Sequence, residues 1–453
     1  MLGKPGWRRA GTCVLPLAFA FSGALASPSP TEARLASHWC ADGGGLLHKT
    51  GEDGESSRLA FPQRPTGVRC TATFAFPAES LPQNGKAVAL ELEVLGAAVP
   101  SPDGYFAAID ILDAKGSRLA PRMFGYAHAT GVSETVRAIL SADLLSAGAE
   151  VQVLLSANDG SSMEFGFPRA RRVEEWDRRL PMQVRTVFDV FRRKAYPGKK
   201  ALEWGDVERR LAGLSQNADD DAATVITTVR NLASMLAMPH ATAMSAGVYE
   251  ASPCPDAMEV VTDDKTMRII SGPFMALGDP QCHDMYAKES ARRVVDALRS
   301  HGVRAVVVDL RSNSGGNMWP MLYALRPFLG EGRLLGYAGA EQRWVELTDG
   351  RLREDGRQVF PDLGVAYERS KLPVEVWICA GTASSGEAAA IALKDSGATL
   401  VGEPTRGLTT ANDVIELPHG VRLLLTTGVM TSSAGEPYGG AIRPDIVRTV
   451  GCD

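Results

Sequence analysis

One segment of the sequence places two serines among small residues, between an apolar run and a helical pattern. This is the stretch 381–387, GTASSGE, which follows the largely apolar residues 374–379. A hydroxyl at a helix N-terminus lies beside unpaired N–H groups and the positive end of the helix dipole, which favour a developing negative charge. Ser384 is therefore a candidate nucleophile. The alternative is that Ser384 or Ser385 only caps the helix.

A second segment contains paired glycines directly after another apolar run. Residues 306–310 are almost wholly apolar, and the chain then runs through a polar turn to Gly315 and Gly316. Such glycines let the backbone approach a ligand and turn N–H groups outward, as an oxyanion hole requires. A plain tight turn is the alternative. Asp309 and Arg311 are expected to brace this turn as an ion pair.

A third segment supplies a possible base, His240, just after an amphipathic helical pattern. A serine needs a base to become nucleophilic at neutral pH, and imidazole has a suitable pKa. A structural role is the alternative for His240. The other histidines are not set beside a recognisable catalytic segment; they are His38, His48, His128, His283, His301 and His419.

The elements that must position these residues fall into three regions. Residues 27–170 show short alternating runs separated by Gly, Pro, Asp and Ser, which predicts a β-rich, sandwich-like N-terminal domain. Residues 171–246 change to helical spacing and predict a helical subdomain that carries His240. Residues 247–453 alternate strands and helices, as in an α/β layered core.

Composition and charge limit the classes of protein to which this chain can belong. The chain has 453 residues, 45% of them hydrophobic, and a net charge of -5. These values suit a soluble globular protein, and the lack of a long basic run argues against nucleic acid as a partner. Residues 1–26 combine a basic start, a short apolar stretch and an Ala-Leu-Ala ending, as in a signal peptide. No later stretch is apolar enough for a membrane span. We therefore expect a periplasmic or secreted protein.

Six cysteines follow the predicted signal peptide. In an oxidising compartment they are expected to pair, and Cys40 with Cys70 and Cys254 with Cys282 are plausible because each pair brackets about 30 residues. Cys379 lies in an apolar run and is expected to be a small buried hydrophobe. No Cys/His spacing indicates a metal site, so no metal or cofactor is expected.

Together, the ordered segments resemble the tail-specific, or C-terminal processing, serine peptidase superfamily over roughly residues 180–450. The matching motifs are Asp309-Leu-Arg-x-Asn-x-Gly-Gly316, Thr382-Ala-Ser-x-x-Glu387, Val401-Gly-Glu-Pro-Thr-x-Gly407 and Arg443-Pro-Asp-Ile-Val447. The resemblance implies a crotonase-like α/β core with Ser384 as nucleophile. It also implies an oxyanion hole made by the N–H of Ser385 with that of Gly315 or Gly316, and a bracing role for Glu387.

The sequence departs from that family at one decisive position. Many members carry a lysine base just after the glycine that Gly407 matches, and here Leu408 stands there. Other branches use a Ser–His arrangement with the histidine in the place of His240. The sequence resembles the nisin-resistance-protein-like branch, which has a Thr-Ala-Ser-Ser motif of this kind. The family's PDZ domain has no room in this chain. Glu436 lies near the place where some histidine branches carry a third, acidic member.

The resemblance implies an exported endopeptidase that hydrolyses a polypeptide substrate through a Ser384–His240 acyl-enzyme mechanism. Two alternatives remain at this stage. One is a catalytically weak or inactive member that binds a peptide or a hydrophobic ligand. The other is acyl-CoA chemistry on a crotonase-like core. Oligomeric state and the role of the N-terminal domain are not readable from the sequence.

Overall fold

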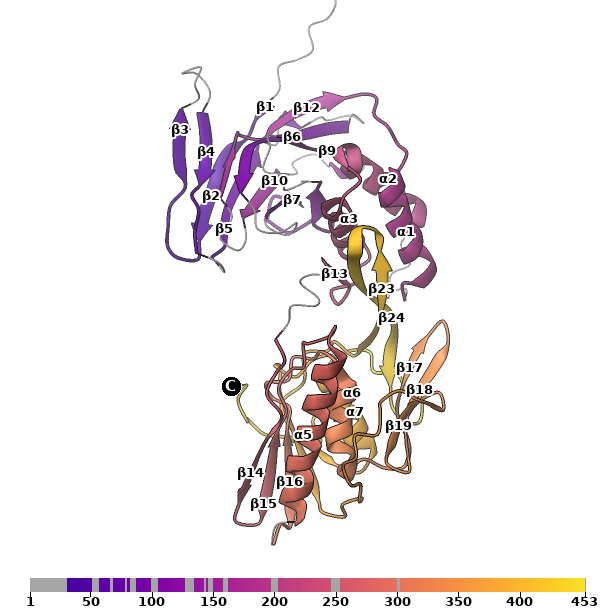
Figure 1. Cartoon of the computed structure of the whole chain (residues 1–453). Helices are drawn as coiled ribbons and strands as arrows, with labels where there is room; N and C mark the ends of the chain where they lie inside the picture. The colour runs from indigo at the N-terminus through magenta and orange to yellow at the C-terminus, as the bar shows by residue number, and fades with distance from the viewer. Residues whose placement is uncertain are drawn as a thin grey trace, which may run out of the picture.

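The structure is a computed structural model of the whole chain. It describes residues 31–452 except for these segments: 51–56, 66–67, 78–79, 82–86, 99–104, 127–133, 142–143, 146–149, 158–161, 197–202, 246–252 and 300–301. The predicted signal peptide, His128 and His301 lie outside the described residues. The described chain forms two bodies, one above the other in Figure 1, which a long β-hairpin joins.

The upper body begins with two antiparallel sheets. One contains β2 (Arg34–Cys40), β5 (Cys70–Phe76), β10 (Glu150–Ala157), β7 (Tyr105–Leu112) and β8 (Met123–Gly125), in that order. The other contains β1 (Thr31–Glu32), β12 (Arg169–Val173), β6 (Ala87–Ala98), β11 (Ser162–Phe165), β4 (Ser57–Phe61), β3 (Leu47–Thr50) and, paired to β6, β9 (Glu134–Leu140). Phe74 of the first sheet contacts Phe165 of the second at 6.1 Å between ring centroids. The N-terminal region is therefore β-rich, with its apolar side chains between the sheets.

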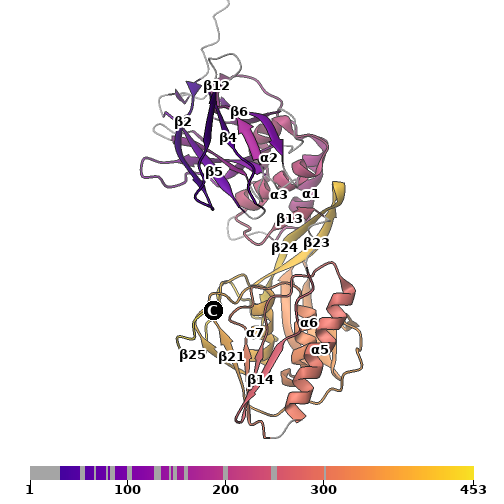
Figure 2. The same ribbon diagram turned by 60° about the vertical axis from the view of Figure 1, so that its left-hand side comes forward.

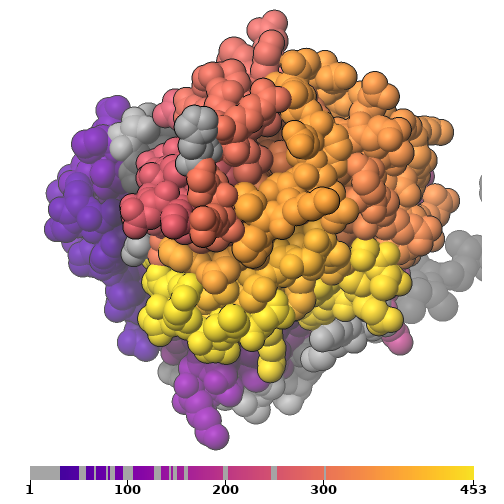
Figure 3. Space-filling model, turned by 90° about the horizontal axis from the view of Figure 1, so that it is seen from below, coloured from indigo at the N-terminus to yellow at the C-terminus, as the bar shows by residue number. Residues whose placement is uncertain are grey.

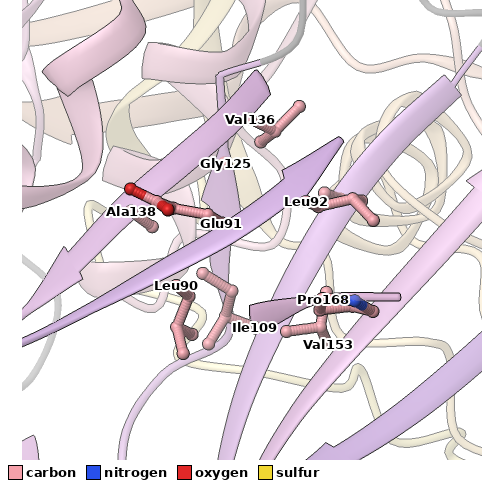
Figure 4. A pocket seen from close by; sticks show the side chains of 10 residues that line it. Leu90, Glu91, Leu92, Ile109, Gly125, Val136, Ala138, Val153 and Pro168 are labelled. Atoms are coloured by element: carbon pink, nitrogen blue, oxygen red, sulfur yellow. The ribbon is translucent and has the colours of Figure 1, made fainter. Parts of the chain in front are cut away.

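The interior of this sandwich is closely packed. A cavity of about 10 Å³ lies between Leu90, Ile109, Val136 and Val153, among other residues (Figure 4). A cavity must reach about 10–15 Å³ to hold one water molecule. This cavity is therefore too small to hold more than about one water molecule.

Three helices complete the upper body: α1 (Met182–Lys194), α2 (Trp204–Leu214) and α3 (Ala222–Met235), with the 3-10 turn η3 (Ser215–Asn217) after α2. Helix α1 buries Val184, Val187, Phe188 and Phe191, which is the spacing of one helical face. These residues belong to the same hydrophobic core as the sandwich. The boundary expected near residue 170 thus runs through one continuous core.

The lower body is built on a six-stranded sheet. Its order is β14 (Glu259–Asp263), β15 (Thr266–Ile270), β16 (Ala305–Asp309), β21 (Val374–Ile378), β22 (Thr399–Gly402) and β25 (Ile446–Val447), and all neighbours are parallel except β14 and β15. Helices α5 (Pro280–Arg299), α6 (Met318–Leu325) and α7 (Ser385–Asp395) accompany the sheet, and the 3-10 turn η4 (Arg326–Phe328) follows α6. This body has its own core. The chain is mixed α/β, as predicted.

A further sheet connects the two bodies. It contains β13 (Thr242–Ser245), β24 (Val421–Thr431), β17 (Gly332–Gly339), β18 (Gln342–Thr348), β19 (Arg351–Glu354) and β20 (Arg357–Gln358), in that order, with β23 (Thr410–Leu417) also paired to β24. One end of β24 pairs with β13 of the upper body and the other with β17 of the lower body. The β23–β24 hairpin, closed by η5 (Pro418–Gly420), reaches the upper body beside α3 and α1 (Figures 1 and 2). The residues at its tip join the upper core.

Three disulfides fasten the described chain. Cys40 pairs with Cys70 and Cys254 pairs with Cys282. The expectation of a free Cys379 is wrong, because Cys379 forms a disulfide with Cys452 across 73 residues. Cys379 is indeed buried, but β21 ends beside the C-terminal segment, which lies on the surface of the lower body (yellow in Figure 3). None of the helices in the described ranges has both the length and the apolarity of a membrane span.

Candidate active site

Ser384 lies in the turn between strand β21 and helix α7. Its backbone adopts φ 52° and ψ -114°, a region that residues with a side chain rarely occupy. Such a conformation costs roughly 1–3 kcal/mol and persists only where the surroundings hold it. Here they do: the N–H of Ala383 donates to the Asn313 carbonyl at 2.9 Å, and the Thr382 hydroxyl donates to the Leu310 carbonyl at 2.9 Å. The turn presents a half-buried serine at the head of a helix.

Glu387 supports this turn from inside the protein. Its carboxylate accepts the N–H of Ser384 at 2.8 Å, the hydroxyl of Thr405 at 2.5 Å and the N–H of Gly407 at 2.9 Å. The side chain is fully buried, and this burial raises the pKa of Glu387 although the three donors oppose the shift. Thr405 accepts from Ile442 N–H, so its own proton is directed to Glu387. Glu387 thus ties the nucleophile turn to the chain that leads into β23.

The paired glycines pack directly against the turn that carries Ser384. A Cβ atom built on Gly315 would lie 2.8 Å from Ser384 Cβ, and one built on Gly316 would lie 1.8 Å from the Phe274 carbonyl oxygen. Both glycines have positive φ, 117° and 109°. No other residue type could bring this backbone so close to Ser384.

The glycine turn and the start of α7 leave two backbone N–H groups without a partner among the described residues. Gly315 is not one of them, because its N–H donates to the Asn313 side chain at 3.0 Å. Within the described part of the chain, no hydrogen bond takes up the N–H of Gly316 or that of Ser385, the first residue of α7. The Ser385 hydroxyl donates to the Gly316 carbonyl and so holds these two residues together. The geometry favours Gly316 over Gly315 as the donor of the glycine turn.

Asp309 and Arg311 brace the glycine turn, as an ion pair. Arg311 reaches both Asp309 carboxylate oxygens at 3.0 Å, and Arg268 binds the same carboxylate. Burial raises the pKa of Asp309, but the hydrogen bonds from Arg311 and Arg268 outweigh it and leave the pKa below its usual value. Arg311 also donates to the carbonyls of Val450 and Gly451. The C-terminal segment is therefore fixed to the glycine turn by Arg311 and to the end of β21 by Cys452.

His240 follows the C-terminal end of helix α3. Ala237 takes a left-handed φ of 51°, and the N–H of Met238 donates to the Ala233 carbonyl at 2.8 Å, which is a Schellman ending. The chain then turns into β13 with His240 just before it. The ring Nδ1 lies 2.6 Å from Thr410 Oγ1 at the start of β23. Burial lowers the pKa of this half-buried imidazole.

The segment 405–410 connects the candidate base to the candidate nucleophile. Gly407 donates to Glu387, which holds Ser384, and Thr410 contacts His240. Three residues of extended chain span at most about 11 Å, so the contact of Gly407 with Glu387 and that of Thr410 with His240 are at most about this far apart along the backbone. The hydrogen bonds of the described residues do not include a direct one between His240 and Ser384. Catalytic hydrogen bonds of ligand-free enzymes are often long and tighten only when substrate binds.

Other candidates of the sequence analysis lie elsewhere. Glu436 is exposed in a turn where its N–H donates to the Ser432 hydroxyl, and within the described contacts its carboxylate has no link to Ser384 or His240. His419 pairs with Asp220, and His283 contacts the Ala276 carbonyl. The site residues expected from the sequence do not include three that the structure adds. Asn313 contacts Gly315, Thr405 contacts Glu387 and Thr410 contacts His240. Asn313 and Thr405 each lie inside a family motif and so carried a sequence signal, whereas Thr410 did not.

Residues 280–448 match the sequence model of peptidase family S41. The chain contains a peptidase family S41 domain. This S41 domain includes Ser384, Glu387 and the glycine turn, whereas His240 and the β-rich region precede it. The family match therefore covers the candidate nucleophile Ser384 but not the candidate base His240.

Named relatives of the S41 domain come from bacteria and plants. The nisin-resistance protein of Lactococcus lactis subsp. lactis is 29% identical over 168 residues, which are 36% of this chain and 52% of that protein. The chloroplastic carboxyl-terminal-processing peptidase 2 of Arabidopsis thaliana is 33% identical over 141 residues, 31% of this chain and 25% of that protein. The matches thus span about half of the nisin-resistance protein and a quarter of the plant peptidase.

A solved structure resembles this chain beyond the S41 domain. It is a lipoprotein from Streptococcus agalactiae, with a TM-score of 0.50 and 20% sequence identity. The match covers 61% of this chain and 96% of the lipoprotein. At this identity the similarity concerns the fold alone.

Proposed function

We propose that this protein is a serine-type endopeptidase in which Ser384 is the nucleophile and His240 the general base. One observation carries the proposal: a serine in a strained turn at the head of α7 contacts a turn of two positive-φ glycines. Beside it, the N–H groups of Gly316 and Ser385 have no partner among the described residues. This is the arrangement that acyl transfer to a serine requires.

The proposed reaction follows from these positions. Ser384 Oγ attacks the carbonyl carbon of a peptide bond while His240 accepts the hydroxyl proton. The oxyanion receives hydrogen bonds from the N–H groups of Gly316 and Ser385. Loss of either donor would cost about 3–4 kcal/mol of transition-state stabilisation. His240 then protonates the leaving amine. Water, activated by the same imidazole, hydrolyses the acyl-enzyme.

Several features support the use of histidine rather than lysine. Leu408 occupies the place of the family's lysine and carries no proton acceptor. His240 is the histidine that contacts the strand leading from the Glu387 site. Burial lowers the pKa of His240, which keeps the imidazole neutral and able to accept a proton at neutral pH.

Substrate class and location belong to the same proposal. The S41 relatives include a carboxyl-terminal-processing peptidase, which favours a polypeptide substrate. Three disulfides favour an oxidising compartment, in agreement with the signal-peptide pattern of residues 1–26 and with a cell-envelope location. We expect the lower body to have the crotonase-like architecture that the resemblance implies.

The test measures cleavage of a peptide library by purified mature protein and by two variants. Ser384→Ala and His240→Ala should each lose at least a hundredfold in kcat/KM while keeping their thermal unfolding transitions. Matched controls are Ser433→Ala and His419→Ala, which change a serine and a histidine away from the site. A fluorophosphonate probe should label the wild type at Ser384. Cleavage by Ser384→Ala at the wild-type rate would refute the proposal, and an unlabelled protein that binds peptide without cleaving it would favour a binding role.

A further inference from the structure

Among the residues that the structure describes, the imidazole of His240 has one side-chain hydrogen-bond partner, and this partner is uncharged. Thr410 Oγ1 lies 2.6 Å from Nδ1, a contact between residues 170 positions apart in the sequence. In the part of the chain that the structure describes, no acidic side chain forms an ion pair with this ring, and Nε2 has no hydrogen-bond partner. The place that a carboxylate fills in a Ser–His–Asp triad is occupied here by a hydroxyl.

This contact decides which nitrogen can act as the base. A neutral imidazole has one N–H donor and one acceptor nitrogen. When Nδ1–H donates to Thr410 Oγ1, Nε2 keeps its lone pair and can accept a proton from serine. When the Thr410 hydroxyl donates to Nδ1 instead, Nε2 carries the hydrogen and cannot serve as a base. The first tautomer is the competent one.

The position of Thr410 is fixed from both sides. On the chain before it, the Thr409 hydroxyl donates to the carbonyls of Tyr438 and Gly440 at 3.1 and 3.0 Å. On the chain after it, Asn412 Nδ2 reaches the His240 carbonyl at 3.4 Å, so β23 contacts both the backbone and the ring of His240. Thr410 itself is in register with Val429 of β24. The hydroxyl is therefore held by a strand whose start is tied to the Ser384 turn through Gly407 and Glu387.

We propose that Thr410 is a positioning residue that holds His240 with Nδ1 protonated and Nε2 free to accept the proton of Ser384. The inference rests on the proposed function, since it assigns the third member of the proposed catalytic set. Thr410 touches neither substrate nor the reacting atoms and acts only through the imidazole.

The central variant is Thr410→Val, which keeps the β-branched shape and removes the hydroxyl. We expect kcat to fall by about tenfold to a hundredfold, because the base loses its orientation. KM should stay within about twofold of the wild-type value, because the substrate keeps its contacts with the protein. Thr410→Ser should restore at least half of the wild-type kcat. Val414→Ala, an exposed position on the same strand, is the matched control and should retain wild-type kinetics.

A second measurement reads the tautomer without relying on activity. Imidazole ¹⁵N chemical shifts of the full mature protein, with His240→Asn used to assign the signal, should show protonated Nδ1 and unprotonated Nε2 at pH 8. In Thr410→Val the signal should change towards a mixture of tautomers. A wild-type signal with Nε2 protonated would overturn the inference.

The outcomes separate the inference from the proposed function. Full activity of Thr410→Val together with inactive Ser384→Ala and His240→Ala would refute the role of Thr410 and leave the peptidase intact. Activity of Ser384→Ala equal to wild type would instead refute the peptidase proposal. Loss of activity in Thr410→Val that Thr410→Ser does not restore would also count against the hydroxyl.

Discussion

A methyl group built on Gly315 would lie 2.8 Å from the Cβ atom of Ser384 and 3.3 Å from its Oγ. The glycine turn and the nucleophile turn are thus in contact at van der Waals distance, although 69 positions separate them in the sequence. The glycine is needed here for two reasons, its φ of 117° and the lack of space for a side chain.

Gly315→Ala should therefore remove activity by displacing the two turns. Gly397→Ala is a matched control, because Gly397 has a similar φ of 101° but no atom within 4 Å of an added Cβ. Both variants should lose roughly 1–3 kcal/mol of unfolding free energy through backbone strain. Only Gly315→Ala should lower kcat/KM, by about a hundredfold or more, in peptide-cleavage assays. Equal kinetics for the two variants would contradict the contact.

The pH dependence of cleavage should reflect the environment of His240. Burial lowers the pKa of this imidazole, so the base stays neutral to a lower pH than a free histidine. We expect the acid limb of kcat/KM to have its midpoint below about 6.5, the ordinary histidine value. Activity is lost as pH falls through the lowered pKa. A midpoint above 7 in stopped-assay pH profiles would argue against His240 as the base.

Asp309→Asn should destabilise the protein in a pH-dependent way. The substitution leaves Arg268 and Arg311 without their carboxylate and should cost about 3–5 kcal/mol of unfolding free energy at pH 7. The net pKa of Asp309 is lowered in the folded state, so its contribution is present above the usual value near 3.8 and is lost as pH falls through the lowered pKa. Urea unfolding of the wild type and of Asp309→Asn, at pH 7 and near pH 3, measures the difference in their unfolding free energies. A difference that grows in acid would oppose it.

The C-terminal disulfide should matter for catalysis as well as for stability. The double variant Cys379→Ser with Cys452→Ser releases the segment that Arg311 also binds, next to both catalytic turns. Loss of a native disulfide typically costs about 2–5 kcal/mol. We expect a lower thermal midpoint and a kcat reduced about tenfold.

The paired serine variant of Cys40 and Cys70 is the control for that experiment. This disulfide joins β2 and β5 in the sandwich, far along the chain from Ser384. Its removal should lower the thermal midpoint with kcat within about twofold of wild type. Similar kcat losses in both double variants would show that the C-terminal disulfide has no specific role at the site.

Local patterns in the sequence determined the elements that carry the site. Largely apolar runs at 306–310 and 374–379 became strands β16 and β21, which bury alternate or successive apolar side chains, and the helical spacing of 184–191 became one face of α1. The close backbone approach expected at Gly315 and Gly316 occurs with positive φ at both residues, which glycine tolerates. These features depend on neighbours within a few residues, which the sequence lists directly.

Only the tertiary structure decided which distant groups meet. The partner of Cys379 is Cys452, the N–H of Gly315 is taken by Asn313, and the partner of His240 is Thr410. The shared core of the sandwich and the helices likewise crosses the boundary expected near residue 170. Such pairings depend on strand register and on how β24 spans the two bodies, because a shift of one residue turns each side chain to the other face of the sheet.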